Sequence, residues 1–321
     1  MDSVTRVEVP ARICGSVNSA DVCILIPTLN EAATIGQLIK DFRQEGFSNI
    51  LVIDGNSKDG TGQIAAAEGT KVVMQTGKGK GQAMIQAFRL IESPYVVMVD
   101  GDGTYLAREA RSLLKPVLEG RVDHVIGNRL ENYSPGAFTK LNLVGNRLIN
   151  MFFDVAYGVK LKDILSGYRA FTLESVKELE LNKTGFEIET EISVECILKK
   201  QRVEEVPITY LPRSKKGATK LNPVKDGFRI GSTIYNLAKL HNPMFYFGII
   251  GFVLIMAGLF TGTFVVVEWF RGIDHIPLTI LTTLLIIFGL QMFIFGTLSD
   301  FVLTLHRQTV QLIMEMNKQK K

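Results

Sequence analysis

The sequence predicts an α/β fold, a mostly parallel sheet with helices on both faces, followed by a hairpin of two membrane-spanning helices. Short apolar runs alternate with segments of helical spacing over residues 21–129, and such alternation is typical of parallel sheets covered on both faces. Polar side chains follow each apolar run, at positions that gather at one edge of a parallel sheet. Residues 244–267 and 276–298 contain no charged side chain, and each segment is long enough to cross a bilayer.

The composition bounds the class of protein. Hydrophobic residues make up 46% of the 321 residues, and their excess lies mostly after Pro243. A net charge of +4 is too small to indicate nucleic-acid binding, so we expect no nucleic-acid partner. The three cysteines, Cys14, Cys23 and Cys196, fit no metal-binding spacing and indicate reduced thiols. Residues 1–20 carry no clear pattern and no apolar signal-peptide region, so we expect an N-terminal extension.

The predicted elements follow one another along a single domain at 21–222. The predicted strands comprise residues 22–26, 49–54, 71–74, 95–100 and 124–127, with helices at 32–42, from 61, from 81 to 91, and at 107–118. Beyond them we expect a long helix at 137–157, a strand at 170–173, an amphipathic helix at 187–200 and a last strand at 203–211.

The run at 95–100 predicts a buried central strand that ends in two carboxylates, Asp100 and Asp102. Residues two apart on an extended chain share a face. The two carboxylates can therefore grip one hard cation, with a diphosphate behind it. The alternative is a surface turn, because Asp and Gly are common turn residues.

Other loops are expected to deliver polar groups to the same crevice. The residues that come just after a predicted strand are Glu31, Asp54, Lys78 with Lys80, and Arg129. The Gly-Lys-Gly turn at 77–81 is not a Walker A loop. It either faces phosphate or carboxylate with its backbone N–H groups, or it is a flexible turn.

The C-terminal third indicates attachment to a membrane. Residues 223–243 are basic and amphipathic and predict a helix on the membrane surface, although a core helix fits the same pattern. Basic residues flank both apolar segments, while their connection, 268–275, holds one Arg and no Lys. The positive-inside rule therefore places 21–222, both termini and the basic tail 299–321 in the cytoplasm of a multi-pass cell-membrane protein. Two membrane helices per chain also leave room for a homo-oligomer.

Six motifs in order resemble those of the inverting family 2 glycosyltransferases with the GT-A fold. They are residues 26–31, 54–61, 77–83, 100–102 and 163–169, and the basic loop that holds Arg213 and Lys220. The loop at 163–169 is similar to the Asp-x-x-Ser-Gly-Tyr-Arg loop of dolichyl-phosphate sugar synthases. The resemblance covers about residues 21–222, and its specificity lies in the order of the motifs.

The resemblance implies a role for each motif. The nucleotide-sugar donor would be bound by Pro27, Thr28, Asn30, Glu31, Asp54, Asn56, Lys80, Gly101 and Asp102. Mg²⁺ or Mn²⁺ would be held by Asp102 with Asp100 or Thr104. The phosphate of a dolichyl or polyprenyl lipid would be bound by Arg129, Arg169, Arg213 and Lys220. The catalytic residues would be Asp100, Asp102, Arg129 and Asp163.

The expected function is transfer of one sugar from a nucleotide sugar to dolichyl or polyprenyl phosphate, for protein N-glycosylation. Mannosyl members of the family usually carry Asp-Asp-x-Ser, and here Gly55 replaces the second Asp. This form resembles the archaeal dolichyl-phosphate transferases, so UDP-glucose or UDP-N-acetylglucosamine is the favoured donor and GDP-mannose the alternative. The acceptor phosphate is already ionised, so it needs alignment and charge compensation rather than a strong base.

Two other classes of protein stay open. A processive polysaccharide synthase of the same superfamily would carry a Gln-x-x-Arg-Trp motif, and the only Trp, Trp269, lies outside such a motif. A non-catalytic, membrane-anchored nucleotide-sugar-binding module would keep the fold without turnover. The intact Asp100 and Asp102 argue against that module.

Overall fold

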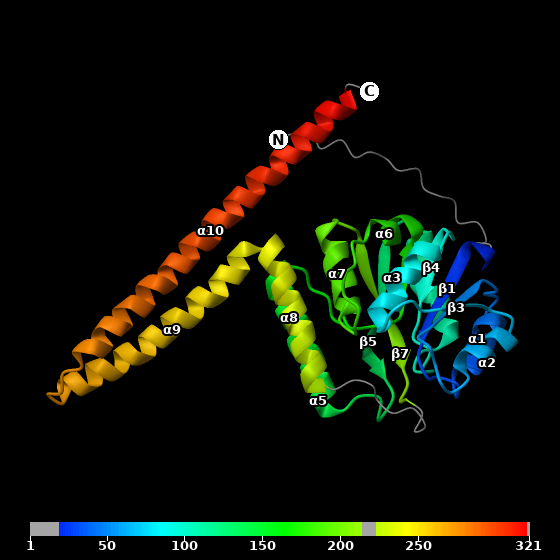
Figure 1. The fold of residues 1–321 in the computed structure, drawn as a ribbon, viewed down its shortest axis with the longest axis horizontal. Helices are drawn as coiled ribbons and strands as arrows, with labels where there is room; N and C mark the ends of the chain where they lie inside the picture. The colour runs from blue at the N-terminus through cyan, green and yellow to red at the C-terminus, as the bar shows by residue number, and fades with distance from the viewer. Residues whose placement is uncertain (1–18, 214–222, 320–321) are drawn as a thin grey trace. The chain divides into compact units, whose positions relative to one another are not determined.

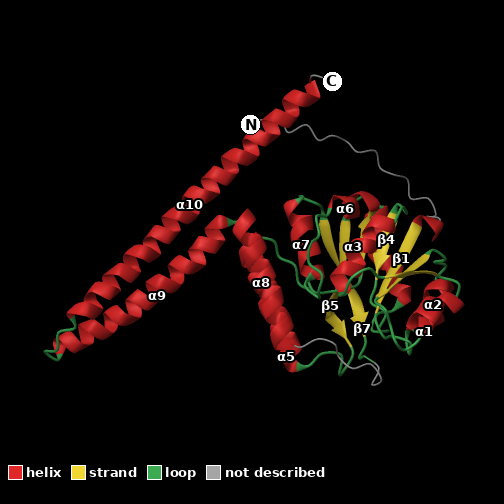
Figure 2. Ribbon diagram, viewed as in Figure 1, coloured by secondary structure: helices red, strands yellow, loops and turns green. Residues whose placement is uncertain are grey.

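The computed structural model describes residues 19–213 and 223–319, which form two compact units. The first unit contains residues up to 154 and 158–234, and the second contains 155–157 and residues from 235 onward. Figure 1 traces the chain through both units, and Figure 2 distinguishes their helices from their strands. Most of the predicted extension at 1–20 and most of the predicted basic loop lie outside the described residues.

Within the described residues, the first unit is built on a seven-stranded sheet in the order β3-β2-β1-β4-β6-β5-β7. The strands are β1 (Val22–Thr28), β2 (Ile50–Asp54), β3 (Lys71–Met74), β4 (Tyr95–Met98), β5 (His124–Tyr133), β6 (Arg169–Thr172) and β7 (Val203–Tyr210). All neighbouring strands pair in parallel except β6, which is antiparallel to both β4 and β5. The predicted α/β class with a mostly parallel sheet is confirmed.

Helices cover both faces of this sheet (Figure 2). They are α1 (Ile35–Gln44), α2 (Thr61–Ala67), α3 (Lys80–Leu90), α4 (Ala110–Leu118), α5 (Lys140–Tyr157), α6 (Leu173–Glu178) and α7 (Ile188–Leu198), with 3-10 helices at Ser19–Asp21 and Ala107–Glu109. Successive residues of a strand point to opposite faces. Accordingly, Ile24 of β1 belongs to the core built with α1 and α4, and Leu25 to the core built with α3 and α7.

Two strands differ in length from the prediction. β4 ends at Met98, so Asp100 lies in the turn after the strand rather than within it. β5 continues to Tyr133, because its far half also pairs with β7. A register shift after Asn128 separates the two halves of β5. Arg129 lies in this irregularity, and such bulges redirect the side chains that they contain.

α7 is buried more completely than the predicted amphipathic helix. Every residue from Ile188 to Cys196 is buried, including three glutamates. One of them, Glu191, accepts a hydrogen bond from the backbone N–H of Lys183 at 2.8 Å, and burial raises its pKa above the ordinary value. The helix is therefore a central element of the first unit, and its acidic residues have partners inside the protein.

The second unit consists mainly of two long helices, α9 (Pro243–Phe270) and α10 (Ile276–Gln319). Pro243–Phe270 and Ile276–His306 are long and apolar enough to cross a membrane, with mean hydropathies of 2.4 and 2.3. Glycines let the helices approach closely, since a Cβ on Gly251 would lie 2.7 Å from the carbonyl oxygen of Gly289. The predicted hairpin of two apolar helices is confirmed, although α10 continues through the region predicted as a tail.

α8 (Pro223–His241) contributes residues to both units. Several of its apolar side chains were expected to face a membrane surface. Ile230 and Ile234 are instead 7% and 0% exposed, whereas Phe228 is 78% exposed. The two buried side chains fit the alternative of a core helix, and the membrane-surface helix stays a prediction.

Candidate active site

Asp102 lies in the turn after β4 and is 8% exposed. Its Oδ1 atom accepts hydrogen bonds from the backbone N–H and the hydroxyl of Thr104, at 3.1 and 2.6 Å. Its Oδ2 atom accepts a hydrogen bond from Nη2 of Arg213 at 2.7 Å, and the same nitrogen lies 3.5 Å from a carboxylate oxygen of Glu31. Two predicted donor-binding carboxylates, Glu31 and Asp102, therefore meet at one guanidinium.

Asp100 is held by a different cation. Nζ of Lys80 contacts the carboxylates of both Asp100 and Glu189. Burial lowers the pKa of Lys80, but the two carboxylates outweigh burial and raise that pKa above the ordinary value for lysine. Lys80 was predicted to contact the donor, and in this structure its charge is compensated inside the protein.

The Gly-Lys-Gly turn packs against the segment that precedes α7. The N–H of Gly81 donates to the carbonyl of Thr184 at 3.0 Å. A Cβ on Gly79 or Gly81 would overlap the backbone of residues 183–184, so only glycine permits this close approach. The N–H of Gly81 thus binds protein rather than a phosphate, and the turn positions Lys80 toward Asp100.

The Tyr210 ring lies beside Arg129, and its hydroxyl is affected by the charges of Asp100 and Asp102. The Arg129 guanidinium lies 5.3 Å from the centre of the Tyr210 ring. Burial raises the pKa of Tyr210, the charge of Arg129 lowers it, and the charges of Asp102 and Asp100 raise it. β4 and β5 are both antiparallel to β6, so the turn after β4 and the bulge of β5 lie toward the same edge of the sheet.

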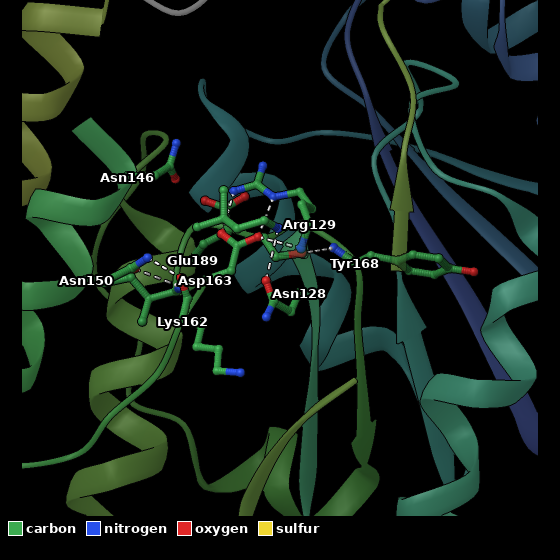
Figure 3. A network of polar contacts seen from close by, with 12 residues as sticks. Asn128, Arg129, Asn146, Asn150, Lys162, Asp163, Tyr168 and Glu189 are labelled. Atoms are coloured by element: carbon green, nitrogen blue, oxygen red, sulfur yellow. Dashed lines mark hydrogen bonds and ion pairs between the residues drawn. The ribbon is translucent and has the colours of Figure 1, made fainter. Parts of the chain in front are cut away.

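Arg129 is clamped by Asp163, and Figure 3 shows the two side chains facing each other. The Asp163 carboxylate accepts hydrogen bonds from the backbone N–H, Nε and Nη2 of Arg129, at 2.9, 2.8 and 2.7 Å. Asp163 is 0% exposed and Arg129 is 8% exposed. Asp163 therefore holds Arg129 in place, and its predicted catalytic role stays a prediction.

The backbone at Asp163 is fixed by two further side chains. Glu205 on β7 accepts the backbone N–H of Asp163 at 2.9 Å. Asn150 on α5 accepts the N–H of Ile164 at 3.2 Å and donates its amide to the carbonyl of Lys162. Figure 3 shows Asn150 reaching this loop from α5. The position of Arg129 thus depends on α5, β5 and β7 together.

Arg169 requires a correction, because the structure gives it a different role from the predicted contact with a lipid phosphate. It is 0% exposed and donates hydrogen bonds to the carbonyls of Ser166, Ile164 and Glu189, at 2.8, 2.6 and 3.1 Å. Burial lowers its pKa below the ordinary value for arginine. Its guanidinium ties the 163–169 loop to α7, and we remove it from the proposed acceptor site. Lys220, predicted for the same site, lies outside the described residues.

The loops after β1 and β2 are joined by hydrogen bonds. Asn30, in a left-handed conformation with φ of 53°, donates its N–H to the hydroxyl of Ser57 at 2.9 Å and accepts the N–H of Lys58 at 2.8 Å. Asn56, with φ of 63°, donates its amide to the carbonyl of Gln75 at 3.3 Å. The side chains of Asn30 and Asn56 therefore shape the predicted nucleotide loops through contacts inside the protein.

The remaining predicted donor residues lie where β1, β2 and the turn after β4 approach one another. Pro27 and Thr28 end β1, and both are buried. Asp54, 3% exposed at the end of β2, accepts hydrogen bonds from the N–H and hydroxyl of Ser57 at 3.1 and 2.5 Å. A Cβ on Gly101 would lie 2.7 Å from the side chain of Thr28, so glycine is required at this crossing.

The chemistry at Asp102 fits a divalent cation. Its Oδ2 atom already accepts a positively charged group, and Mg²⁺ commonly binds one or two carboxylates together with substrate phosphates and water. Asp100 contacts Lys80, which it shares with Glu189, and Thr104 donates its hydroxyl to Asp102. The assignment of Asp100 and Thr104 as metal ligands stays a prediction. Across residues 19–213 and 223–319, no group of three or more His, Cys, Asp or Glu side chains gathers as a metal cluster. A cation here would depend on substrate phosphates for other ligands.

Sequence reasoning missed several residues of this site. Glu189 balances Lys80, and Tyr105 accepts the N–H of Gly167 through its hydroxyl at 3.1 Å. Phe138 lies under the Arg129 guanidinium, 5.7 Å from its ring centre. Glu189 is one of three glutamates of α7, so the sequence pattern alone did not distinguish it.

Comparisons with known proteins agree with the geometry. The model of glycosyl transferase family 2 matches residues 23–180. Glycosyltransferase AglJ of Haloferax volcanii is 48% identical over 297 residues, which cover 92% of this chain and 98% of that protein. A dolichyl-phosphate hexose transferase of the same organism is 31% identical over 67% of this chain and 92% of its own length.

Solved structures share the fold of the first unit. A crystal structure of glucosyl-3-phosphoglycerate synthase from Mycobacterium tuberculosis, in complex with Mn²⁺ and UDP-glucose, superposes with a TM-score of 0.55. The identity is 20%, over 68% of this chain and 79% of that one, and so the likeness concerns the fold alone. The predicted GT-A fold is confirmed. Taken with the near-complete match to a glycosyltransferase at 48% identity, this establishes that the chain belongs to glycosyltransferase family 2.

Proposed function

We propose that this chain moves one sugar from a nucleotide sugar to the phosphate of a dolichyl or other polyprenyl lipid, as a membrane-bound inverting transferase. The observation that carries the proposal is the arrangement around Asp102, where a carboxylate suited to a cation contacts Arg213 and lies at the same edge of the sheet as Arg129. The similarity to a dolichyl-phosphate hexose transferase supports the same class of acceptor.

The transfer step needs no strong general base at this site. A lipid phosphate is ionised at neutral pH, so one of its oxygens can attack the anomeric carbon directly. The new bond joins that oxygen to the anomeric carbon, while the bond from this carbon to the nucleoside diphosphate breaks. Arg129 and Arg213 would align the acceptor phosphate and compensate its charge. Asp163 would act through Arg129 rather than on the substrate.

The donor diphosphate would lie at Asp102. A divalent cation, Mg²⁺ or Mn²⁺, would supply positive charge to the departing diphosphate when bound. Asp102 would hold this cation in exchange for its contact with Arg213, and Thr104 would keep the carboxylate oriented. The nucleoside would lie against the joined loops after β1 and β2, beside Thr28 and Asp54.

We also propose the donor and the pathway of this transfer. UDP-glucose and UDP-N-acetylglucosamine are the favoured donors because Gly55 stands where mannosyl members carry Asp, and GDP-mannose is the alternative. The product would be a lipid-linked sugar for protein N-glycosylation. The predicted topology has both α9 and α10 crossing the cell membrane, with the first unit and both termini in the cytoplasm.

The test is a transfer assay with the purified full-length protein and dolichyl phosphate. Radiolabelled UDP-glucose, UDP-N-acetylglucosamine and GDP-mannose are each supplied with Mn²⁺, with Mg²⁺ or with a chelator. We expect labelled lipid from one donor only, and only with metal. Asp102→Asn should lower turnover by roughly 100-fold or more, the size typical of a lost electrostatic contact with a developing charge.

The matched control is Asp21→Asn, which makes the same chemical change at an exposed position before β1 and should leave turnover unchanged. Wild-type turnover in Asp102→Asn with metal present would remove the assigned donor site. Absence of labelled lipid with every donor would instead favour the non-catalytic binding module.

A further inference from the structure

α5 presents a row of large apolar side chains to solvent. Leu141, Val144, Leu148 and Met151 are 60%, 54%, 55% and 59% exposed. Their spacing of three, four and three residues places them along one face of the helix. Single exposed apolar residues are ordinary, but a contiguous row marks a surface that contacts something else. We call these four residues the α5 stripe.

The stripe is separate from the face that α5 packs against its own protein. Asn150 is 7% exposed, and Phe153 and Ala156 are each 0% exposed. At 100° per residue Asn150 and Phe153 lie about 160° and about 140° around the helix from Leu148, on its opposite side. α5 therefore has two apolar faces, one covered by the protein and one that the described residues leave exposed.

The charges beside the stripe favour a lipid surface as the occupant. Lys140 and Arg147 are exposed and lie along one border of the row, whereas the first acidic residue of α5 is Asp154, in its last turn. A basic border beside an apolar face is the pattern of helices that lie in the plane of a bilayer with anionic lipids. The same chain holds two helices long enough to cross a membrane, which would keep a bilayer available to this surface.

We propose that α5 lies in the membrane interface, with the α5 stripe inserted about 5–10 Å into the boundary between headgroups and acyl chains. The sequence had suggested α8 as the surface helix, but α8 buries Ile230 and Ile234 inside the protein. Among the described residues of the first unit, α5 is the helix that exposes an apolar row of this length.

This placement gives α5 a second task, and that part of the inference rests on the proposed function. Asn150, on the inner face of α5, holds the loop of Asp163 through Lys162 and Ile164. Asp163 in turn fixes Arg129. One rigid helix thus joins the bilayer surface to the arginine proposed to meet the lipid phosphate, so the height of that arginine above the membrane is set by the α5 stripe.

The experiment measures how deeply a spin label on α5 lies in the membrane. It uses the full-length protein in vesicles of phosphatidylcholine and phosphatidylglycerol. Leu148→Cys carries the label in a Cys14→Ser background, since Cys23 and Cys196 are buried. Burial raises their thiol pKa values to about 11 and about 12, which keeps both unreactive at neutral pH. The control label is Lys40→Cys on α1, where the lysine side chain is 55% exposed.

We expect the label at position 148 to be relaxed strongly by oxygen, which concentrates in lipid, and weakly by a water-soluble nickel chelate. The label at position 40 should show the reverse order. Equal and strong relaxation by the nickel chelate at both positions would overturn the proposal. Spin–spin broadening at 148 that disappears on dilution with unlabelled protein would also overturn it, because a second copy would then cover the stripe. No donor or acceptor is present, so failure of the proposed transferase activity would leave this result unaffected.

Discussion

Two arginine–aspartate pairs near the edge of the same sheet are built very differently. Asp163 is fully buried and receives three hydrogen bonds from Arg129, whose guanidinium also lies over the ring of Tyr210. Asp102 receives a single hydrogen bond from Arg213, whose side chain is 28% exposed. The first pair is fixed by several contacts inside the protein, whereas the second joins two loops through one hydrogen bond from a partly exposed arginine.

This difference separates a fixed charge from an exchangeable one. Breaking a buried pair leaves an uncompensated charge inside the protein, whereas a partly exposed pair is screened by water. We therefore interpret Arg129 as a preorganised binding group. On the proposed function, Arg213 would be a counter-ion that leaves Asp102 when the metal ion binds.

The largest expected effect is that of Asp163→Asn, which leaves the Arg129 charge buried without its partner. We expect the free energy of unfolding to fall by about 3–5 kcal/mol, the usual cost of removing one member of a buried pair. Denaturant unfolding of the detergent-solubilised protein, followed by the fluorescence of a label on the first unit, measures this loss.

A double-mutant cycle supplies the control for that experiment. Arg129→Met alone removes the charge that needs compensation, and Arg129→Met combined with Asp163→Asn should recover much of the lost stability. If Asp163→Asn unfolds like the wild-type protein, the pair is not the clamp that its geometry indicates.

The same contrast explains how far the sequence could lead. The positions of Asp100, Asp102 and Asp54 were predictable, because the first two follow β4 and the third ends β2. Local pattern places such residues at one edge of a parallel sheet. The partners of these residues were not predictable, because Lys80 and Glu189 meet Asp100 only through the packing of α3 and α7.

The sequence also did not show which polar side chains are buried. Arg169 belongs to a motif of polar and phosphate-binding character, yet the antiparallel strand β6 carries it into the core between Ser166 and Glu189. The sequence pattern of α5 predicted a helix, but apolar residues lie on two of its faces. Only the three-dimensional structure tells which face is covered by protein.

Arg213→Gln tests the second pair by removing the guanidinium that contacts Asp102. Arg213 is 28% exposed but Asp102 is 8% exposed, so we expect the free energy of unfolding to fall by less than the about 3–5 kcal/mol expected for breaking a fully buried pair. Mn²⁺ should bind the donor-free protein more tightly, because no guanidinium competes for Oδ2 of Asp102. Titration of the free Mn²⁺ signal by electron paramagnetic resonance measures this affinity without any turnover.

The control for the exchange is Arg121→Gln, which removes an exposed arginine paired with Glu119 and Glu204 elsewhere on the first unit. It should leave Mn²⁺ affinity at the wild-type value. Weaker Mn²⁺ binding in Arg213→Gln, or an equal change in both variants, would argue that Arg213 and the metal do not share Asp102.

The smallest expected effect concerns Glu205, which supports the buried clamp through the backbone N–H of Asp163. Burial, aided by the charge of Asp163, raises the pKa of Glu205 above its ordinary value of 4.5, although hydrogen bonds from Lys162 and Asp163 oppose the rise. A carboxyl group with a raised folded-state pKa contributes stability that is present below pH 4.5 and is lost as the pH rises through the folded-state pKa. The Gln side chain of Glu205→Gln cannot titrate. The unfolding temperature of this variant should therefore rise relative to that of the wild-type protein as the pH increases from 4.5 to 7. Glu204→Gln, the same change at a more exposed neighbour, should show no such gain, and a difference from wild type that stays constant with pH would contradict the burial of Glu205 beside the clamp.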